Sequence, residues 1–395
     1  LIPSKEYYDE HPEFFALVKG KRDNSHQHQI CLTNPDVLRI SIEKSLDALR
    51  KNPEATLISI SQSDNNDPCE CEHCQKIADE EESQSGPIIH FVNAVADAIA
   101  KEFPHVMVDT LSYLYSEKPP KIVRPRDNVQ IRFALLNHCH SHPLRSCKFQ
   151  PHGNNGQGLY METTFADMLR AWSKIARHIA IWDYAVYFEF YFMMRPNFHT
   201  LADNMRFYKE NNVDSIFYES NANTGGEMVE LRGYILTQLM WNLDFDVQAG
   251  IAEFCHEFFG EAAPYILEYL DITRDALLES NFHMCLSDYP TSLWISADLL
   301  KKADALFDKA EQALKTDPIR LRRVQKERLA VRFAKFFYPA FVFEDRGAEA
   351  DAFMADLRSH GGIVTSTYWG SRNIRQLIFR GIWRPHEDDM EVIPD

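Results

Sequence analysis

The chain has 395 residues, of which 45% are hydrophobic and 12% aromatic, so it can bury a large core and is long enough for two domains. Its formal net charge is −16, and an acidic protein does not neutralise a phosphate backbone, so the composition argues against nucleic acid and favours a neutral or cationic ligand. No apolar run approaches the ~20 residues that cross a bilayer.

Short apolar runs alternate with amphipathic segments from Cys31 to about residue 245, which is the rhythm of repeated β-α units. Helices are predicted between the apolar runs, one beginning at Asn34-Pro35 and another continuing from Pro87. The predicted strands are 30–32, 57–61, 107–113, 129–135, 179–183 and 215–218.

This alternation predicts an α/β fold with a TIM-type (β/α) barrel as the catalytic region, residues 1–245. Such a barrel closes with eight strands, so the first strands are expected to precede a chain that begins LIPSKEYYDEH, without Met or a signal peptide. From Glu227 helical periodicity replaces the strand signal, which predicts an α-helical C-terminal domain, residues 246–380, packed on the barrel. The acidic tail, residues 381–395, is expected to fray.

Three carboxylates come directly after predicted strands, namely Asp64, Asp183 and Glu219. Barrel enzymes place their catalytic groups at the carboxyl ends of the strands. Hydrolysis of a glycosidic bond needs an acid that protonates the leaving oxygen and a second group that stabilises or attacks the sugar cation. These residues are therefore the candidate catalytic residues. The alternative for each is that it caps the next helix or binds a loop amide.

Aromatic residues gather at the same strand ends, and sugar rings stack their apolar faces on aromatic side chains. Core packing is the alternative, and it is the interpretation favoured for Phe188, Phe190 and Phe192. The predicted substrate-binding residues are Asn65, Tyr113, His138, Trp182, Tyr184, Tyr187 and Tyr218.

Cys69, Cys71 and Cys74 form a tight thiol cluster just beyond Asp64. A closed structural zinc site takes four ligands, so one ligand must come from elsewhere in the chain. A disulfide with one free thiol, or a redox motif, is the alternative to zinc. The candidates for the fourth ligand are Cys31, Cys139, Cys147 and the histidines at 138, 140 and 142.

The histidines His138, His140 and His142 alternate along the chain, so they would share one face of an extended segment. Such a triple suits a bound metal or an ordinary polar ligand surface. A carboxylate-supported ligand set is not evident nearby, so no catalytic metal is predicted there. No cofactor is expected to be required for catalysis.

The order of several motifs resembles a known family. It is EYYDEHPEFFAL, QICLTNP, SISQSDN followed by C-x-C-x-x-C, GPIIHFVNAVADAIA, and WDY with a downstream RPNF. These resemble a large bacterial family once described only as a domain of unknown function, some members of which are classed as glycoside hydrolase family 163. The resemblance runs from residue 1 to about Tyr269. It implies a secreted, periplasmic or cell-surface TIM-barrel hydrolase that acts on N-glycans as an endo-β-N-acetylglucosaminidase.

By position, the resemblance matches Asp64 in SQSDN and Glu219 in FYES to motif carboxylates, which it implies to be the general acid and its partner. The chain departs from the family near WDY, where members often have Asn and this chain has Tyr187. If the substrate carries an N-acetyl group, its carbonyl oxygen can serve as nucleophile while the second carboxylate orients the amide. A non-catalytic carbohydrate-binding barrel and a hydrolase of another polysaccharide are the alternatives.

Overall fold

The computed structural model describes residues 2–25, 27–136, 138–148, 163–220, 225–288, 290–361 and 371–380, the last segment without the side chains of 371–373. The chain divides into two compact units that interleave along the sequence. None of the helices in these segments is both long enough and apolar enough to cross a membrane. The first unit is Leu1–Leu136, Gln150–Asp183 and Tyr208–Phe217, and the second is Asn137–Phe149, Tyr184–Phe207 and Tyr218–Asp395.

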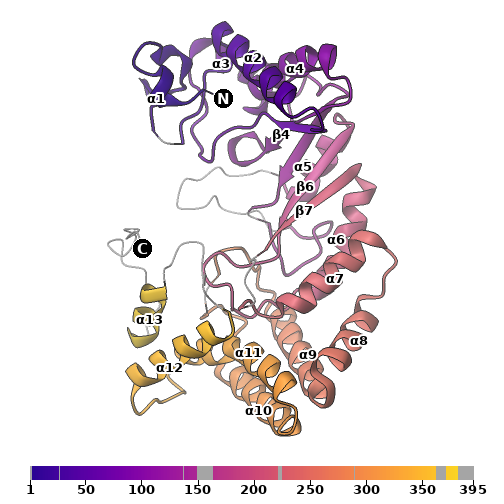
Figure 1. Ribbon diagram of the computed structural model, residues 1–395, viewed down its shortest axis with the longest axis vertical. Coiled ribbons are helices and arrows are strands. Elements are labelled where there is room, and N and C mark those ends of the chain that lie inside the picture. Colours follow the sequence, from indigo (N-terminus) through magenta and orange to yellow (C-terminus); the bar gives the residue numbers. More distant parts are fainter. Residues whose placement is uncertain are drawn as a thin grey trace. The chain divides into compact units, whose positions relative to one another are not determined.

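A five-stranded parallel sheet forms the centre of the first unit, in the spatial order β3-β4-β5-β6-β7 (Figure 1). Leu57 pairs with Met107, Val108 with Val129, and Gln130 with His178, which sets the register of the first four strands. The strands are β3 Leu57–Ser59, β4 Met107–Ser112, β5 Val129–Ala134, β6 His178–Tyr184 and β7 Val213–Glu219.

The strand β5 lies in the middle of this sheet and is apolar along most of its length. Val129, Ile131 and Phe133 are fully buried. In the sequence, Gln130 and Arg132 separate these three apolar residues, so the strand alternates apolar and polar positions. This alternation with a period of two is the pattern that predicts a strand.

Helix α2 begins at the predicted Asn34-Pro35 signal, and α4 begins at Ser85, just before the predicted Pro87. Asn34 caps α2, since its side-chain oxygen accepts hydrogen bonds from the backbone N–H groups of Asp36 at 2.9 Å and Val37 at 3.2 Å. Helix α4 packs against both α2 and β4. The helices that lie mainly in this unit are α1 Ser4–Tyr7, α2 Pro35–Lys51, α3 Glu72–Glu80, α4 Ser85–Glu102 and α5 Phe165–Ser173, and a short hairpin joins β1 Leu17–Val18 to β2 Lys21–Arg22.

The α/β class is confirmed, but the closed TIM-type barrel predicted for residues 1–245 is wrong. In the described segments the sheet holds five strands, with β3 and β7 at its two edges. A barrel closes only when its first and last strands hydrogen-bond to each other. The apolar side chains Leu57 on β3 and Phe217 on β7 remain 39% and 49% exposed, as residues on open sheet edges do.

The predicted strand at 30–32 is also wrong, although the other five predicted strands are confirmed. Ile30 forms an isolated antiparallel bridge with Phe15. Its neighbour Gln29 uses its side chain to hold the loop that follows β3. Ile30 thus lies in an extended segment that is fixed by a single bridge and by the side chain of Gln29. In the sequence, such a segment has the apolar pattern of a short strand.

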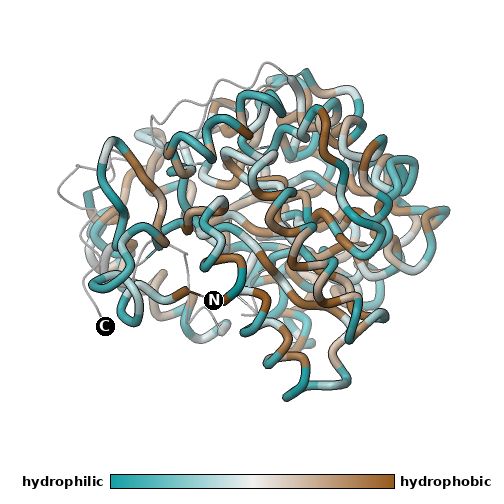
Figure 2. The backbone as a smooth tube through the Cα atoms, turned by 90° about the horizontal axis from the view of Figure 1, so that it is seen from above, coloured by the Kyte–Doolittle hydropathy of each residue, from teal (hydrophilic) through white to brown (hydrophobic). Residues whose placement is uncertain are grey.

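The second unit is built mainly from helices. Figure 2 shows hydrophobic and hydrophilic residues alternating in short stretches along the backbone, as they do in helices with one buried face. Its core contains an aromatic group in which Phe192 and Phe190 pack on Phe333, with ring centroids 4.7 and 4.9 Å from it. The helices are α6 Phe198–Glu210, α7 Val229–Trp241, α8 Val247–Phe259, α9 Ala263–Ser280, α10 Ala297–Ala313, α11 Pro318–Lys335, α12 Arg346–Ser359 and α13 Ser371–Arg380.

The core position predicted for Phe190 and Phe192 is therefore confirmed, whereas Phe188 is half-buried. The boundaries predicted at residues 245 and 380 stay predictions. The acidic tail, 381–395, lies outside the described residues.

We expect Phe192→Ala to lower the free energy of unfolding by about 3–5 kcal/mol, because it opens a cavity between Phe190, Phe333 and Phe353. Urea unfolding measures the loss. Phe188→Ala is the matched control, and its loss is expected to be smaller because Phe188 is half-buried. Equal losses in the two variants would contradict this packing.

Candidate functional site

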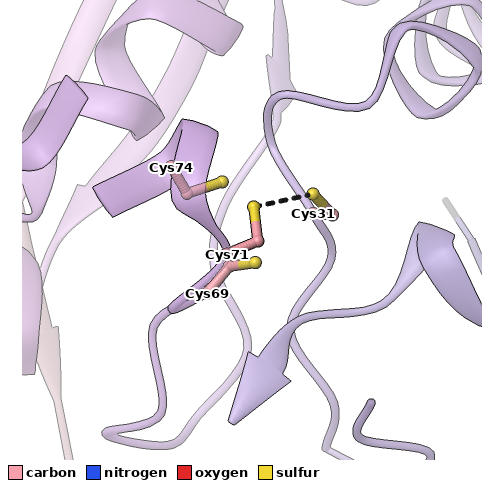
Figure 3. A group of neighbouring side chains, drawn as sticks. All are labelled: Cys31, Cys69, Cys71 and Cys74. Carbon is pink, nitrogen blue, oxygen red and sulfur yellow. Dashed lines mark hydrogen bonds between the residues drawn. The ribbon is translucent and has the colours of Figure 1, made fainter. Parts of the chain in front are cut away.

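Four cysteine thiols converge at one point of the first unit. The Sγ atoms of Cys31, Cys69, Cys71 and Cys74 all lie within 4.8 Å of one another, and those of Cys31 and Cys71 are 3.6 Å apart (Figure 3). All four cysteines are free in the structure. The fourth member that the C-x-C-x-x-C spacing requires is thus Cys31, which comes from a loop on the other side of the cluster.

Local structure brings these thiols together. Cys71 precedes helix α3 directly and Cys74 lies in its first turn, so the helix start turns both side chains to the same side. Cys31 is fixed from the opposite loop by a backbone hydrogen bond to the carbonyl of Phe14 at 2.8 Å. The backbone N–H of Leu17 donates to Cys69 Sγ at 3.4 Å, a contact typical of thiolates that carry negative charge.

The thiols influence one another's protonation. Contacts with Cys69 and Cys74 lower the pKa of Cys31, and the same contacts raise the pKa of Cys69 and Cys74. These contacts favour deprotonation of Cys31 over deprotonation of Cys69 and Cys74. Thiolates are the form that binds soft divalent metals, and four of them make a closed tetrahedral site. The cluster is able to bind a metal.

A cavity of about 200 Å³ lies beside the cluster, with Cys69 and Cys74 in its wall. Its polar lining comes from Gln62 and Ser63, which follow β3, and from Tyr115, which follows β4. The cavity is smaller than the ~300–1,000 Å³ of pockets that enclose a drug-sized ligand. It has room for a small group or a single ring and not for an oligosaccharide.

Asp64 and Tyr113, two of the predicted site residues, are brought together at the carboxyl ends of β3 and β4. The Tyr113 hydroxyl donates to Asp64 Oδ1 at 2.8 Å, and Asp64 is exposed. The neighbouring Asn65 instead fastens its own loop, because its side-chain oxygen accepts from Gln29 Nε2 at 2.9 Å and from the N–H of Asp67 at 3.0 Å. Of these three, Asp64 is the side chain with access to solvent and a fixed orientation.

Asp183 and Trp182 lie near the end of β6 in different environments. Asp183 is only 3% exposed, and its carboxylate accepts a hydrogen bond from the Tyr208 hydroxyl at 2.9 Å. Trp182 is half-buried, and its ring meets that of Phe217 edge to face at a centroid distance of 5.2 Å. Consecutive strand residues point to opposite faces of a sheet, which separates the two side chains.

Glu219 and Tyr218 end β7, and both are half-buried. The backbone carbonyl of Glu219 accepts a hydrogen bond from the N–H of Ala185 at 2.8 Å. This bond continues the pairing of the strand ends within the second unit. The Glu219 side chain therefore lies at the carboxyl end of β7, an edge strand of the sheet.

Tyr184, Tyr187 and His138 are buried in the second unit. The Tyr184 carbonyl accepts from the Arg195 guanidinium at 3.0 Å, and the same guanidinium lies 4.8 Å from the centre of the Tyr187 ring. The His138 ring lies 3.8 Å from that of His140. These three predicted substrate contacts belong to packed surroundings, with Tyr187 only 1% exposed.

The RPNF motif supplies part of those surroundings. The Arg195 N–H donates to Glu227 Oε2 at 3.3 Å, and Arg232 donates to the side chain of Asn197 and to the Arg195 carbonyl. Burial raises the pKa of Glu227 to about 7. The motif thus builds a buried polar network. The motif identifies Arg195 and Asn197 in the sequence, but it does not predict that Glu227 and Arg232 are their partners.

Two further carboxyl groups with shifted pKa values were missed by sequence reasoning. Burial raises the pKa of Glu117, just after β4, to about 8, and that of Asp288 in the second unit to about 7. Shifted groups are candidates for functional sites. Glu117 is only 4% exposed, so a glycan would not reach it. Neither residue follows a strand directly, and no local pattern distinguishes them from solvated acids.

Residues 1–271 match a protein family described as a domain of unknown function, DUF4838. The chain belongs to this family. Its description names no activity, and the matched range contains the four-cysteine cluster, Asp64 and all five strands of the sheet. No curated protein matches the chain.

We expect Glu117→Gln to make the protein more stable than the wild type at high pH. Unfolding lowers the pKa of Glu117 from about 8 to an ordinary ~4.3, so the unfolded wild type releases a proton that the folded wild type keeps. Wild-type stability therefore falls as pH rises between these values, and the variant lacks this loss.

Urea unfolding of both proteins at intervals from about pH 5 to about pH 8 measures the difference, which should grow with pH. Asp127→Asn is the control, because the Asp127 side chain is 85% exposed and its ion pair with Arg177 contributes little. A Glu117→Gln difference that stays constant with pH would show that Glu117 ionises normally in the folded protein.

Proposed function

We propose that this DUF4838 protein is a glycoside hydrolase that cleaves β-linked N-acetylglucosamine-containing glycans by carboxylate chemistry. The observation that carries the proposal is the exposed Asp64, held by the Tyr113 hydroxyl at the carboxyl end of its strand. An oriented carboxylate with access to solvent is what acid–base catalysis at a glycosidic oxygen needs. The resemblance of the motif order to glycoside hydrolase family 163 supports the proposed class of substrate.

Within the proposal, Asp64 and Glu219 are the two carboxylates. Asp64 follows β3 in the first unit, and Glu219 ends β7 in the second unit. One protonates the leaving oxygen. The other orients the substrate N-acetyl group, whose carbonyl oxygen attacks the sugar carbon, or acts on that carbon itself. Asp183 has a supporting place, because its burial and its bond from Tyr208 hold it away from solvent.

Two further features support a sugar ligand. The cavity of about 200 Å³ is lined by apolar side chains together with serine, glutamine and tyrosine groups, and these polar groups suit the hydroxyl and amide groups of one sugar ring. The net charge of −16 suits a neutral ligand better than a polyanion. The proposal includes a secreted, periplasmic or cell-surface location, where N-glycans are met.

We expect Asp64→Asn and Glu219→Gln each to lower turnover at least about a hundredfold, because each removes an ionisable group that acts on the reacting bond. Mass spectrometry of glycans released from an N-glycosylated protein measures turnover. Asp127→Asn is the matched control, since Asp127 precedes β5 and lies at the opposite, amino end of the strands. It should leave turnover unchanged.

Near-normal turnover in either variant would overturn the assignment of that carboxylate. Absence of glycan release by the wild type would overturn hydrolysis itself. If the same glycan then raised the Tm of the wild type, the alternative of a carbohydrate-binding protein would take its place.

We also propose that the four-cysteine cluster holds a structural zinc ion. Zinc bound by four thiolates at about 2.3 Å places the sulfur atoms about 3.8 Å apart, close to the 3.6 Å between Cys31 and Cys71. A disulfide would join two of the thiols and leave the other two unused. The metal would hold the loop after β3 against the loop of Cys31, next to the cavity.

We expect Cys71→Ser to lose about one zinc ion per chain and to lower the Tm by about 5 °C or more, because zinc binding contributes directly to folding. Elemental mass spectrometry and thermal unfolding measure the two effects. Cys255→Ala is the control, since Cys255 lies in α8 outside the cluster, and it should keep its zinc. Recovery of a disulfide among these cysteines by non-reducing peptide mapping would overturn the proposal.

A further inference from the structure

The second unit contains a separate group of metal-binding side chains. The ligand atoms of Cys139, His142, Cys147 and His283 all lie within 4.8 Å of one another. His142 Nδ1 is 3.3 Å and His283 Nδ1 is 3.2 Å from Cys139 Sγ, and His283 Nδ1 is 3.7 Å from Cys147 Sγ. The sulfur atoms of Cys139 and Cys147 do not form a disulfide in the structure.

These spacings fit the corners of a tetrahedron around zinc. With zinc–sulfur distances of about 2.3 Å and zinc–nitrogen distances of about 2.0 Å, sulfur and nitrogen ligands lie about 3.5 Å apart. The three sulfur–nitrogen distances, 3.2, 3.3 and 3.7 Å, lie on both sides of that value. Two thiolates and two imidazoles are one of the common ligand sets of closed structural zinc sites.

Hydrogen bonds of the backbone hold the segment of Cys139, His142 and Cys147 next to the segment of His283 without any metal. The N–H of His140 donates to the carbonyl of Met284 at 2.8 Å, and the N–H of Met284 donates to Ser141 Oγ at 2.9 Å. These bonds join the segment after β5 to the segment after α9. Because they lie beside His142 and His283, they set the two imidazoles next to each other, with ring centroids 4.7 Å apart.

The other two ligands are positioned by a turn. The carbonyl of Pro143 accepts from the N–H groups of Ser146 at 3.1 Å and Cys147 at 3.0 Å, which returns the chain toward Cys139. The turn is fastened to α6, because the N–H of Leu144 donates to Asn204 Oδ1 at 2.7 Å. All four ligand positions are therefore held by contacts other than those among the ligands.

A polar neighbour supports one imidazole. The side chain of Asn281 lies next to His142, where polar residues around metal sites help to orient a histidine ligand. Asn281 ends α9 in the left-handed conformation with φ of 50°, which asparagine adopts more readily than most residues. Cys139 is buried and the other three ligands are half-buried, so an ion can enter from solvent.

We propose that Cys139, His142, Cys147 and His283 bind a second zinc ion, distinct from the one proposed for the four-cysteine cluster. The chain fills all four positions, so the site is structural and leaves no position for a substrate. It links residues that are 144 apart in the sequence, fastening the segment after β5 to the end of α9. A disulfide between Cys139 and Cys147 would link only the eight-residue turn and would not use the imidazoles that converge on the thiols.

X-ray absorption at the zinc edge tests this proposal on the intact wild-type chain. With both sites filled, each zinc should show on average about three sulfur and about one nitrogen neighbours, and the chain should hold about two zinc ions. A four-cysteine site alone would give about four sulfur neighbours and no nitrogen, and that result would overturn the proposal. The measurement needs no variant to fold and does not depend on any glycosidase activity.

Variants then assign the ion to its ligands. His283→Ala should lower the zinc content by about one ion per chain and leave a signal of about four sulfur neighbours. Cys285→Ser is the matched control, since Cys285 lies two residues away and outside the ligand group, and it should keep both ions. Undiminished zinc in His283→Ala, or a Cys139–Cys147 disulfide in non-reducing peptide mapping, would overturn the proposal.

The two zinc proposals fail in different ways. Loss of the second site alone leaves the sulfur-only signal, whereas loss of the four-cysteine site leaves about two sulfur and about two nitrogen neighbours per zinc. Binding of zinc to the apoprotein, followed by titration calorimetry, should give a stoichiometry of about two ions per chain in the wild type and about one in His283→Ala. A stoichiometry of about one in the wild type would overturn the second site.

Discussion

The loop between β3 and α3 has no regular structure of its own, so the arrangement of the first unit near its cavity depends on the side chains that fasten this loop. The convergence of Cys31 on Cys69, Cys71 and Cys74 is the main constraint. The side chain of Gln29 adds to it, because it both donates to the carbonyl and accepts from the N–H of Ser63 at 2.9 Å. A loop held at both ends in this way presents Asp64 in one orientation. The loop therefore loses little conformational entropy when a ligand binds.

The strands and the ring packing could be predicted because they depend on local composition. β5 alternates apolar residues with Gln130 and Arg132, and Asn34-Pro35 starts a helix through contacts within four residues. Closure of a barrel is a different kind of property, since it requires the edge strands β3 and β7 to pair, and these lie far apart in the sequence. The rhythm of β-α units is the same in an open parallel sheet and in a barrel, so it supports the class and not the closure.

The same distinction between local and distant contacts explains the cysteines. The spacing of Cys69, Cys71 and Cys74 shows a cluster with a missing member, yet the member that completes it is 40 residues from Cys71. Cys31 was one of several candidates because spacing alone does not rank distant partners. Cys139 and Cys147 were candidates for the same place, and the structure instead brings them to His142 and His283. His283 stands in a segment without any recognisable motif, so only the folded chain reveals it.

Asp64 and Asp183 show that position at a strand end does not by itself set the access of a carboxylate to solvent. Both carboxylates accept a tyrosine hydroxyl, from Tyr113 at 2.8 Å and from Tyr208 at 2.9 Å. The two carboxylates differ in their access to solvent, because Asp64 is exposed in the loop and Asp183 is buried. A sequence shows that a residue lies near the end of a strand. It does not show which face of the sheet the side chain points to, because a shift of one residue in the strand end reverses the face. Because a proton donor must reach the substrate, solvent access favours Asp64 over Asp183 as the group that acts on a bound sugar.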